Sequence, residues 1–581
     1  MTVERVITEH MDLWTGAVTQ KSGSGRGSRS KRELTGIKKL RELILELAVR
    51  GKLVRQDLNE EPASQLLKRI ADLKVERQRV AGSRKSKSLP EVSPEEVPFE
   101  LPHNWAHARL GSLVDIVRGI TFPASEKSKS PEDGRIACLR TSNVQEQIEW
   151  DDLLYIREKF ISRKDQFVQP NDIVMSMANS RELVGKVAII QANPIGSVTF
   201  GGFLGVIRPI EVVPAFLMAL LRAPQVREEL IGSASQTTNI ANISIGKLNP
   251  LVVGVPPLAE QHRIVEKVDE LIALCDQLEQ QTGDQIEAHE RLVDTLLDTL
   301  TRAANAIELA ENWARVQQHF DTLFTTEHSI ERLKQTILQL AVMGRLVPQD
   351  PTEQTADDFL LMVQEERGRL ISSGEIRRQK QSAKDSYELA SKTLPQGWAE
   401  AVIGDLISLI SGQHLKGDEY FDQKLGDAIP YLTGPAEFGD VSPLPSRFTN
   451  ERRAIASAGD ILITCKGSGV GKLNLANCEI AISRQLMAAR PILVNPAFLQ
   501  MLLLDLEDAI REKIVGIAIP GISREDVMDA PILVPPFAEQ GRIVEMYESL
   551  QSMCEQLKQE LKAEREVKVQ LAHAVVERSV H

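Results

Sequence analysis

The chain has 581 residues and a formal net charge of −12 at pH 7. A chain of this length is too long to fold around a single hydrophobic core, so we expect several domains. The acidic balance excludes a protein that coats nucleic acid regardless of sequence, but it allows a sequence reader with local basic loops. Five cysteines without Cys-x-x-Cys spacing argue against zinc and favour packing roles in a reducing compartment. Because no secretory signal or membrane-spanning apolar stretch is seen, we expect a cytoplasmic protein without a membrane partner.

The N-terminal part of the chain is expected to form helices separated by linkers. Residues 1–20 carry a short helical pattern, and the Gly- and Ser-rich stretch 21–30 has no apolar residue to bury, as is typical of a flexible linker. From Ile37 onward apolar residues recur every three or four positions, which predicts an amphipathic helix ending near Gly51. The charged stretch 58–98, which ends in prolines, is interpreted as a linker in front of a domain.

Two long stretches further along the chain change character, since Gly, Pro and β-branched residues punctuate short apolar runs there. Such runs predict mixed α/β domains built around strands and turns. The stretches also share a pattern, which indicates homologous folds with divergent surfaces. The pattern is Asp172-Ile-Val followed by Val184-Gly-Lys, and Asp460-Ile-Leu followed by Val470-Gly-Lys.

A long helical pattern follows each of these domains, beginning after Pro257 and after Pro536. Its apolar residues alternate spacings of four and three, which is the seam of a coiled coil, and two matched seams in one chain suggest an antiparallel intramolecular pair. A helix of about 40 residues extends ~60 Å. The seam positions are Ile264, Val268, Leu271, Cys275 and Leu278, and then Ile543, Tyr547, Leu550, Cys554, Leu557 and Leu561.

Three segments of the sequence occur twice, as an internal repeat. Residues 37–57 return as 330–350, and the Leu-Pro-x-x-Trp segment that ends at Trp105 returns ending at Trp398. The Val-Pro-Pro-x-Ala-Glu-Gln segment that begins at Val255 returns at Val534. The repeated segments flank the two predicted α/β domains, whose sequences differ. This arrangement predicts one scaffold that presents two different surfaces. The repeat is too long for a solenoid, whose units run ~20–50 residues.

Motifs of catalysis are missing from the sequence. The Gly-rich stretch Gly467-Ser-Gly-Val-Gly-Lys472 resembles a phosphate loop, but Lys466 stands where its first glycine would be required and Leu473 follows the lysine. A tight turn between strands is the favoured interpretation. We find no nucleophile elbow, zinc-protease motif, convincing dinucleotide fingerprint or methyltransferase Asn-Pro-Pro-Tyr/Phe motif. Isolated histidines such as His262 are expected on the surface or in packing.

Polar loops are the positive functional signal, because Arg, Lys, Asn, Gln, Ser and Thr side chains read base edges in DNA. For any one residue, simple exposure to water is the more common role. Recurrence of polar clusters at comparable places in both domains favours the set as DNA-binding. Its members are Arg118, Arg140, Thr141, Asn143, Asn179, Arg181, Gln236, Thr238 and Asn239 in the first domain, and Gln413, His414, Lys416, Lys466, Lys472, Arg484 and Gln485 in the second.

The order of these motifs resembles the specificity subunit of type I restriction–modification enzymes. The resemblance is carried by the helix ends 47–54 and 340–347, the two Leu-Pro-x-x-Trp segments, the Asp-Ile-Val/Leu…Gly-Lys pattern and the two Pro-Pro-x-Ala-Glu-Gln helix starts. It implies two homologous α/β target-recognition domains joined by long antiparallel coiled-coil helices with a pseudo-two-fold internal repeat. The implied divisions are 1–100, N-terminal helices and linker; 101–257, first target-recognition domain; 258–393, central helices and linker; 394–536, second target-recognition domain; and 537–581, C-terminal helix.

The resemblance also implies a function without catalysis. Each domain would read one half of a split double-stranded DNA target, and the helices would set the spacer and bind two methyltransferase subunits. S-adenosylmethionine, ATP and magnesium would belong to partner subunits, including separate motor and endonuclease subunits, and this chain would carry no catalytic residue, metal or cofactor. The expected frame and partner surface comprises the helices 37–50, 264–300, 330–343 and 543–575.

Two other classes of function stay open at this point. A structural coiled-coil adaptor would explain the helices but not two homologous inserts with different loops. A nucleotide-dependent enzyme would need the Gly467 turn to bind ATP. The second insert, residues 394–534, holds twelve Lys and Arg against eighteen Asp and Glu, so a DNA-reading domain there would need a local basic face and help from partners.

Overall fold

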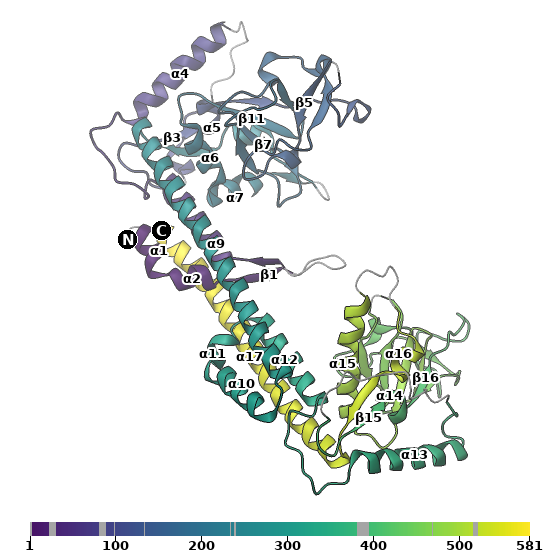
Figure 1. The fold of residues 1–581 in the computed structure, drawn as a ribbon. Coiled ribbons are helices and arrows are strands. Elements are labelled where there is room, and N and C mark those ends of the chain that lie inside the picture. The colour runs from purple at the N-terminus through teal and green to yellow at the C-terminus, as the bar shows by residue number, and fades with distance from the viewer. Residues whose placement is uncertain are drawn as a thin grey trace. The chain divides into compact units, whose positions relative to one another are not determined.

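The structure is a computed structural model in which the chain forms two compact units, each with one sheet-containing domain and several helices (Figure 1). The first unit comprises Met1–Gln285 and Ala563–His581, and the second comprises Ile286–Lys562. Apart from Lys21, the expected flexible linker 21–30 lies outside the described residues. The structure describes residues 3–21, 31–80, 89–97, 99–132, 134–232, 234–236, 240–379, 394–467, 469–514 and 521–580.

The N-terminal helices of the first unit pack around Trp14, which is fully buried. Its indole nitrogen donates a hydrogen bond to the carbonyl of Val6 over 3.2 Å, which ties the second helix to the first. The helix predicted from Ile37 is present and ends at the predicted place, where Gly51 takes a φ of 68°. The elements here are α1 (Val3–Glu9), α2 (Met11–Gly16), β1 (Thr19–Lys21), β2 (Lys31–Glu33) and α3 (Thr35–Val49).

The interpretation of residues 58–98 as a linker is wrong for their first half. Helix α4 (Ala63–Val80) lies there and buries Ala63, Leu66 and Ile70 in the core of the first unit. Lys74 on the same helix donates hydrogen bonds to the carbonyls of Gly111 and Val114, the latter over 2.7 Å. A narrow apolar stripe therefore holds this helix, which is rich in charged residues, against the core of the first unit.

The first mixed domain is built around a four-stranded antiparallel sheet in the order β4-β11-β7-β9. A three-stranded sheet, β10-β5-β6, pairs β10 with β5 in parallel, and a small sheet, β12-β13-β8, flanks them. Strands β3 and β14 pair where the chain enters and leaves the domain.

The strands of this domain are β3 (Ala106–Arg109), β4 (Val114–Arg118), β5 (Arg135–Leu139), β6 (Leu154–Arg157), β7 (Ile173–Ser176), β8 (Ala178–Asn179), β9 (Val187–Ile189), β10 (Val198–Phe200), β11 (Leu204–Pro209), β12 (Ser235–Gln236), β13 (Ala241–Asn242) and β14 (Val252–Val255). Its α-helices are α5 (Leu110–Leu113), α6 (Pro214–Arg222), α7 (Pro224–Gly232) and α8 (Ile245–Leu248). Helix α6 contacts strand β9 and helix α3, which joins the sheet to the helical part of this unit.

The second mixed domain repeats this plan. Its sheet β16-β23-β20-β21 has the order and antiparallel pairing of β4-β11-β7-β9. A second sheet, β18-β17-β22-β19, pairs β17 with β22 in parallel, as β5 pairs with β10 in the first domain. Strands β15 and β24 pair at the entrance and exit. The main sheet and the parallel pair of strands therefore have the same topology in both domains.

The strands of the second domain are β15 (Ala399–Val402), β16 (Ile407–Ser411), β17 (Ile429–Leu432), β18 (Phe448–Thr449), β19 (Ile455–Ala456), β20 (Ile461–Thr464), β21 (Leu473–Leu475), β22 (Ile480–Ile482), β23 (Leu486–Pro491) and β24 (Pro531–Val534). Its helices are α14 (Ile403–Leu406), α15 (Pro496–Ile514) and α16 (Arg524–Met528). Helix α13 (Ala356–Ser372) precedes the domain, as α4 precedes the first, and packs on its core through Phe359 and Val363.

Two long helices follow the domains, α9 (Leu258–Arg302) and α17 (Phe537–Val580), each starting directly after its Pro-Pro pair as predicted. In the first unit, early residues of α9 such as Leu271 share a core with late residues of α17 such as Ala572. In the second unit, late residues of α9 such as Leu297 share a core with early residues of α17 such as Cys554. The two helices are therefore antiparallel, which confirms the predicted fold class.

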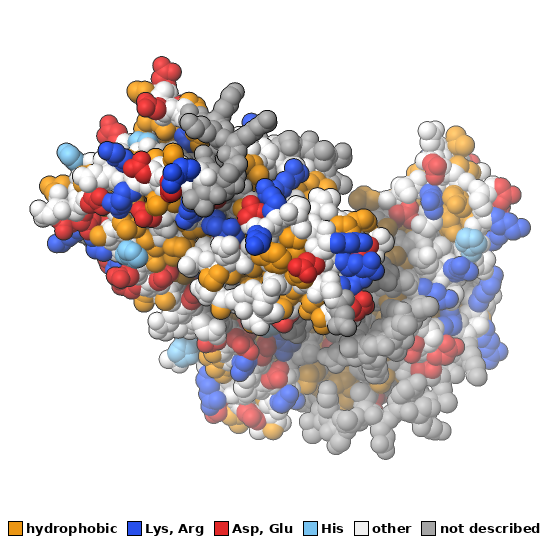
Figure 2. All heavy atoms as spheres, turned by 90° about the horizontal axis from the view of Figure 1, so that it is seen from above, with side chains coloured by type: hydrophobic (Ala, Val, Ile, Leu, Met, Phe, Trp, Pro, Cys, Tyr) orange, Lys and Arg blue, Asp and Glu red, His pale blue; other side chains and the backbone are white. Residues whose placement is uncertain are grey.

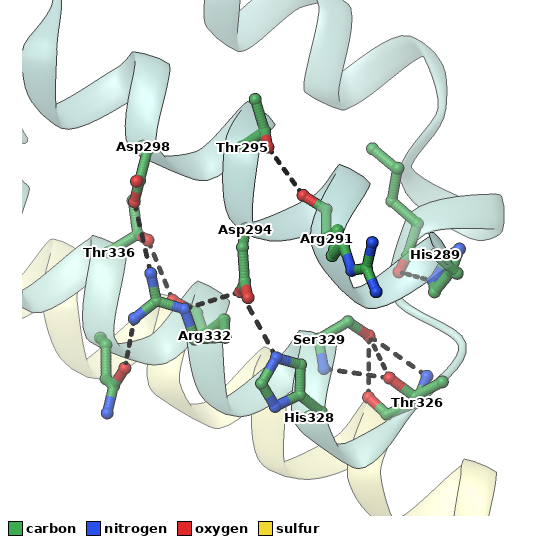
Figure 3. A network of polar contacts seen from close by, with 12 residues as sticks. His289, Arg291, Asp294, Thr295, Asp298, Thr326, His328, Ser329, Arg332 and Thr336 are labelled. Carbon is green, nitrogen blue, oxygen red and sulfur yellow. Dashed lines mark hydrogen bonds and ion pairs between the residues drawn. The ribbon is translucent and has the colours of Figure 1, made fainter. Parts of the chain in front are cut away.

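Helix α12 (Glu327–Val342) is the second copy of α3 and completes the helical core of the second unit with α10 (Ala306–Gln318) and α11 (Phe320–Leu323). Figure 3 shows how polar side chains of α12 face Asp294 and Asp298 of α9. Arg332 lies 2.9 Å from Asp294 and 3.3 Å from Asp298, and His328 lies 3.4 Å from Asp294 (Figure 3). These contacts fix the register of α12 along α9.

The copies α3 and α12 also make equivalent ion pairs with the long helices. Arg41 of α3 pairs with Asp276 of α9 over 2.6 Å, and Lys334 of α12 pairs with Glu555 of α17 over 2.5 Å. In the aligned repeat, Lys334 stands where Arg41 stands in the first copy. The internal repeat in the sequence is thus a repeat of helix–helix contacts.

Four of the five cysteines are buried packing residues, as expected from their isolation in the sequence. Burial raises the pKa of the Cys138 thiol to about 12, so this group stays protonated and unreactive. The fifth, Cys478, is exposed, so the expectation of a packing role is wrong for it.

Candidate nucleic-acid interface

The residues that recur in both copies build the scaffold. In the Pro-Pro-x-Ala-Glu-Gln segments, Gln261 accepts a hydrogen bond from the Val213 amide over 2.9 Å, and Gln540 accepts one from the Asn495 amide over 3.0 Å. Each glutamine, fully buried, thereby ties the start of a long helix to the segment in front of α6 or α15. The repeated motif is explained by this junction.

The repeated Asp-Ile-Val/Leu pattern marks a buried ion pair in each domain. Arg208 forms two hydrogen bonds of 2.7 Å to the carboxylate of Asp172, which is 1% exposed. Arg490 holds Asp460 in the same way, with a shortest distance of 2.9 Å. Two-pronged pairing satisfies a carboxylate that would otherwise be costly to bury.

Four loops gather at one end of the main sheet in each domain, and main-chain hydrogen bonds join them. In the first domain Ile120 donates to Phe200 over 2.9 Å, and Met177 donates to Phe203 over 2.8 Å. We call this end the loop edge. It consists of residues 119–122, 140–142, 177–181 and 201–203 in the first domain, and of residues 412–416, 433–435, 465–467 and 483–485 in the second.

The loop edge of the second domain has the same backbone connections. Gln413 donates to Ile482 over 2.9 Å, and Cys465 donates to Gln485 over 2.8 Å. The amide of Ser483 donates to Leu432 over 2.9 Å, just as Gly201 donates to Leu139 over 3.0 Å in the first domain. Positions on the two edges can therefore be equated one by one, although the side chains differ.

Two glycines make this arrangement possible. A Cβ atom on Gly119 would lie 2.1 Å from the carbonyl oxygen of Gly201, and one on Gly412 would lie 2.0 Å from that of Ser483. Only a residue without a side chain allows the strand ends β4 and β16 to approach the neighbouring loop so closely. Neither glycine was singled out from the sequence.

Three of the predicted DNA-binding residues of the first domain lie together. Arg118, Arg140 and Thr141 line one hollow of about 530 Å³ at the loop edge. The Arg140 guanidinium is held by Asp152 over 2.7 Å and keeps the pKa of that carboxyl below its usual value. The guanidinium is thus oriented before any ligand arrives.

The remaining predicted residues of the first domain have different positions. Asn143 is 2% exposed, and its side-chain amide donates hydrogen bonds to the carbonyls of Glu149 and Asp151. Its side chain therefore stabilises a loop, and the prediction that it is available to bind DNA is wrong. Asn179 in β8 and exposed Arg181 lie on the 177–181 loop. Only the backbone of Gln236, in β12, is described, and Thr238 and Asn239 lie outside the described residues.

All seven predicted residues of the second domain are exposed. Gln413, Lys466, Arg484 and Gln485 occupy three of the four loops of the edge, and His414 and Lys416 extend the first of them. Lys472 lies on the turn between β20 and β21, where Gly467 and Gly471 take φ values of 97° and 90°. The Gly-rich stretch is therefore a strand-connecting turn, as interpreted from the sequence.

Phe203 is a loop-edge residue that the sequence reasoning missed. Its side chain is 66% exposed and lines the same hollow as Arg118. It was passed over because only polar side chains were considered as base readers. Aligning Phe200-Gly-Gly-Phe-Leu204 with Ile482-Ser-Arg-Gln-Leu486 would have revealed it, since Gln485 had been selected at the matching position.

Charge on the surface is mixed and not of one sign. Figure 2 shows Lys and Arg side chains intermingled with Asp and Glu side chains on the face that it draws. Two exposed cations, Lys466 and Arg484, lie on the second loop edge, and a third, Lys472, lies on the neighbouring turn of this acidic domain.

The described residues form neither a membrane-spanning helix nor a metal site. Among them no helix has the length and apolar character needed to cross a bilayer. No group of three or more His, Cys, Asp and Glu side chains in that part of the chain has the arrangement of a metal site.

One scaffold that presents two equivalent edges with different side chains defines a two-module recognition protein. The family model for the type I restriction modification DNA specificity domain matches residues 102–288 and 395–566. The chain is 34% identical to the EcoAI specificity subunit of Escherichia coli over 603 aligned positions and 34% identical to the EcoEI specificity subunit over 612, with 100% of each chain covered. The chain belongs to the family of type I restriction–modification specificity subunits.

A solved structure also aligns with most of the chain. The crystal structure of the HsdS subunit from Thermoanaerobacter tengcongensis aligns with 84% of this chain and 98% of its own, at 20% sequence identity and a TM-score of 0.41.

Proposed function

We propose that this chain is the subunit that reads the DNA sequence in a type I restriction–modification complex. Each mixed domain reads one half of a bipartite duplex target through its loop edge. The observation that carries the proposal is the pair of equivalent loop edges, whose backbone connections match while their side chains differ. Matched backbones with different side chains are expected of two readers with different targets, because side chains at base edges determine sequence preference.

The helical frame is the proposed binding surface for two methyltransferase subunits. Its support is the repeated set of contacts, in which Arg41–Asp276 and Lys334–Glu555 occupy equivalent places. Two equivalent surfaces suit two copies of one partner. In this proposal S-adenosylmethionine, ATP and magnesium are bound by partner subunits, motor and endonuclease subunits join the complex, and the chain works in the cytoplasm without a catalytic residue of its own.

The antiparallel α9 and α17 are the proposed spacer between the two half-sites. Helix α9 has 45 residues and extends ~68 Å at ~1.5 Å per residue. One turn of DNA measures ~34–36 Å. A structural adaptor that does not read DNA would leave the divergence of the two loop edges without a reason, and family membership speaks against it.

Exchange of one domain tests the proposal. Residues 394–536 are replaced by the corresponding segment of a relative with another target, and the chimera is expressed with its methyltransferase partner. Adenine methylation across the host genome then gives the recognised motif. One half of the motif is expected to change while the other half and the spacer stay the same, and a motif altered in both halves would refute modular reading.

A second measurement separates recognition from catalysis. The purified chain with S-adenosylmethionine is expected to leave DNA unmethylated, and activity is expected only after the methyltransferase subunit is added. Methylation by the chain alone would refute the noncatalytic assignment.

A further inference from the structure

One short loop has the same backbone in both domains but opposite side-chain chemistry. It connects β10 to β11 as Gly201–Phe203 and β22 to β23 as Ser483–Gln485; we call these the first and second reading loops. Each is closed by a hydrogen bond, from Leu204 to Gly201 over 2.8 Å and from Leu486 to Ser483 over 2.9 Å. The middle and last side chains of the two loops therefore leave the scaffold from the same places.

The first reading loop offers an apolar ring. Gly201 and Gly202 have no side chains, so the ring of Phe203 is not covered by its neighbours in the loop and is 66% exposed. Its backbone is fixed, because its carbonyl accepts a hydrogen bond from Met177 over 2.8 Å. Burying so large an apolar group against a ligand is favourable, and among the base edges of the major groove only thymine presents a methyl group.

The second reading loop offers hydrogen-bonding groups at the same places. Arg484 replaces Gly202 and Gln485 replaces Phe203, and both side chains are exposed. The Ser483 hydroxyl donates to the carbonyl of Thr433 over 2.7 Å and accepts from the Gln485 amide over 3.2 Å, which fixes the loop. Arg pairs with the O6 and N7 acceptors of guanine, and Gln pairs with the N6 and N7 atoms of adenine.

Resting on the proposed function, we propose that the two reading loops give the half-sites different base chemistry. Phe203 contacts the 5-methyl group of a thymine in the first half-site. Arg484 binds a guanine in the second half-site, with Gln485 contacting the adjacent base pair. The sequence preference of each domain is thus determined at two equivalent positions on a common backbone.

The test uses the complex of the full chain with its methyltransferase partner and duplexes that carry the motif found by methylation mapping. In the first half-site each thymine is replaced in turn by deoxyuridine, which removes only the methyl group. In the second half-site each guanine is replaced by 7-deazaguanine, which removes the N7 acceptor. Binding is measured by fluorescence anisotropy for the wild type, Phe203→Ala, Phe203→Leu and Arg484→Ala.

The wild-type complex is expected to bind one deoxyuridine duplex and one 7-deazaguanine duplex more weakly than the unmodified duplex. The Phe203→Ala complex is expected to bind the deoxyuridine duplex and the unmodified duplex equally well, while it still binds the 7-deazaguanine duplex more weakly. Phe203→Leu keeps an apolar side chain and is expected to retain part of the difference between the deoxyuridine duplex and the unmodified duplex. Arg484→Ala binds the unmodified duplex about 5- to 150-fold more weakly, the equivalent of 1–3 kcal/mol, and loses the sensitivity to 7-deazaguanine. Ile195→Ala and Arg452→Ala, exposed in the same two domains, serve as controls and are expected to bind like the wild type.

The outcomes separate this inference from the function on which it rests. A wild-type complex without any bipartite motif would refute the proposed function itself. A bipartite motif whose deoxyuridine sensitivity is absent, or survives Phe203→Ala, overturns the role of Phe203. A guanine sensitivity that survives Arg484→Ala, or an effect of Arg484→Ala on the first half-site, overturns the role of Arg484. Size-exclusion chromatography of each variant complex shows that the loop substitutions leave assembly intact.

Discussion

The indole nitrogen of Trp398 donates a hydrogen bond to the carboxylate of Glu539 over 3.1 Å. Trp398 stands at the entrance of the second mixed domain, and Glu539 lies in the first turn of α17 at its exit. Gln349, from the repeated segment after α12, reaches the same carboxylate oxygen over 3.3 Å. In the first unit, Gln56 contacts Glu260 over 2.7 Å in the same way. A buried glutamate thus joins the entrance, the exit and the helical frame.

The first prediction concerns the titration of this carboxylate. Burial raises the pKa of Glu539 above its ordinary value of 4.5, although hydrogen bonds from Gln349 and Trp398 oppose the shift. The folded chain then binds this proton more readily than the unfolded chain. The associated stability is fully present below about pH 4.5 and is lost as the pH rises through the folded pKa.

Glu539→Gln removes that titration. The variant is expected to show a flatter dependence of unfolding temperature on pH, above about 4.5, than the wild type. Thermal unfolding followed by Trp fluorescence at a series of pH values measures it. Glu548→Gln, at an exposed position of the same helix, is the matched control. Parallel profiles for wild type and Glu539→Gln would contradict the role of this carboxylate.

The second prediction concerns the close approach at the loop edges. Gly119→Ala and Gly412→Ala each place a methyl group within 2.1 Å of a backbone oxygen, so the reading loop must move. We expect the free energy of unfolding to fall by ~1–3 kcal/mol, and the domain that carries the substitution to bind its half-site more weakly. Hydrogen exchange of the loop-edge amides measures the displacement.

Two glycines provide matched controls for these substitutions. A Cβ atom on Gly232 or on Gly417 would meet nothing within 4 Å. Gly232→Ala and Gly417→Ala are therefore expected to be tolerated. Equal exchange rates in the Gly119→Ala and Gly232→Ala proteins would show that the close approach does not hold the loop.

The third prediction concerns the buried ion pair of the first mixed domain, which lies at the ends of β7 and β11 away from the loop edge. Asp172→Asn leaves Arg208, itself largely buried, without a charged partner and is expected to cost ~3–5 kcal/mol of unfolding free energy. The exposed pair Arg452–Glu479 is the control, since Glu479→Gln should cost no more than ~1 kcal/mol. Denaturant unfolding of both variants measures the difference, and similar losses would argue against a structural role for Asp172.

The fold could largely be predicted because its signals are local and repeated. The spacing of Ile37, Leu40, Ile44 and Leu47 predicts α3, and its recurrence predicts α12. Helix α4 was missed because few of its residues are apolar and many are charged: Ala63, Leu66 and Ile70 are buried and Leu67 is partly buried. The stability of such a helix comes from the domain on which it packs, which composition does not reveal.

The candidate site could be predicted only in part, because burial of a polar side chain depends on tertiary contacts. Asn143 and Thr141 are two positions apart in one polar cluster, yet Asn143 is buried under its loop while Thr141 lines the hollow. Phe203 was overlooked for the opposite reason, since an apolar residue in a strand-rich domain is usually part of the core. The close pairing of Gly119 with Gly201 joins residues distant in sequence.

The last prediction concerns the proposed spacer. Seven residues inserted after Asp284 in α9 and seven after Lys562 in α17 keep the heptad register of both helices. Each helix grows by ~10.5 Å at ~1.5 Å per residue, which corresponds to about 3 base pairs at 3.4 Å each. The methylated motif is expected to keep the bases of both halves and to gain a longer gap. An insertion in α9 alone leaves α17 unmatched, so the helices can no longer pair along their length, and this variant should fail to assemble with its partner. If the double insertion changed the bases that are read, or left the gap unaltered, the helices would not be the spacer.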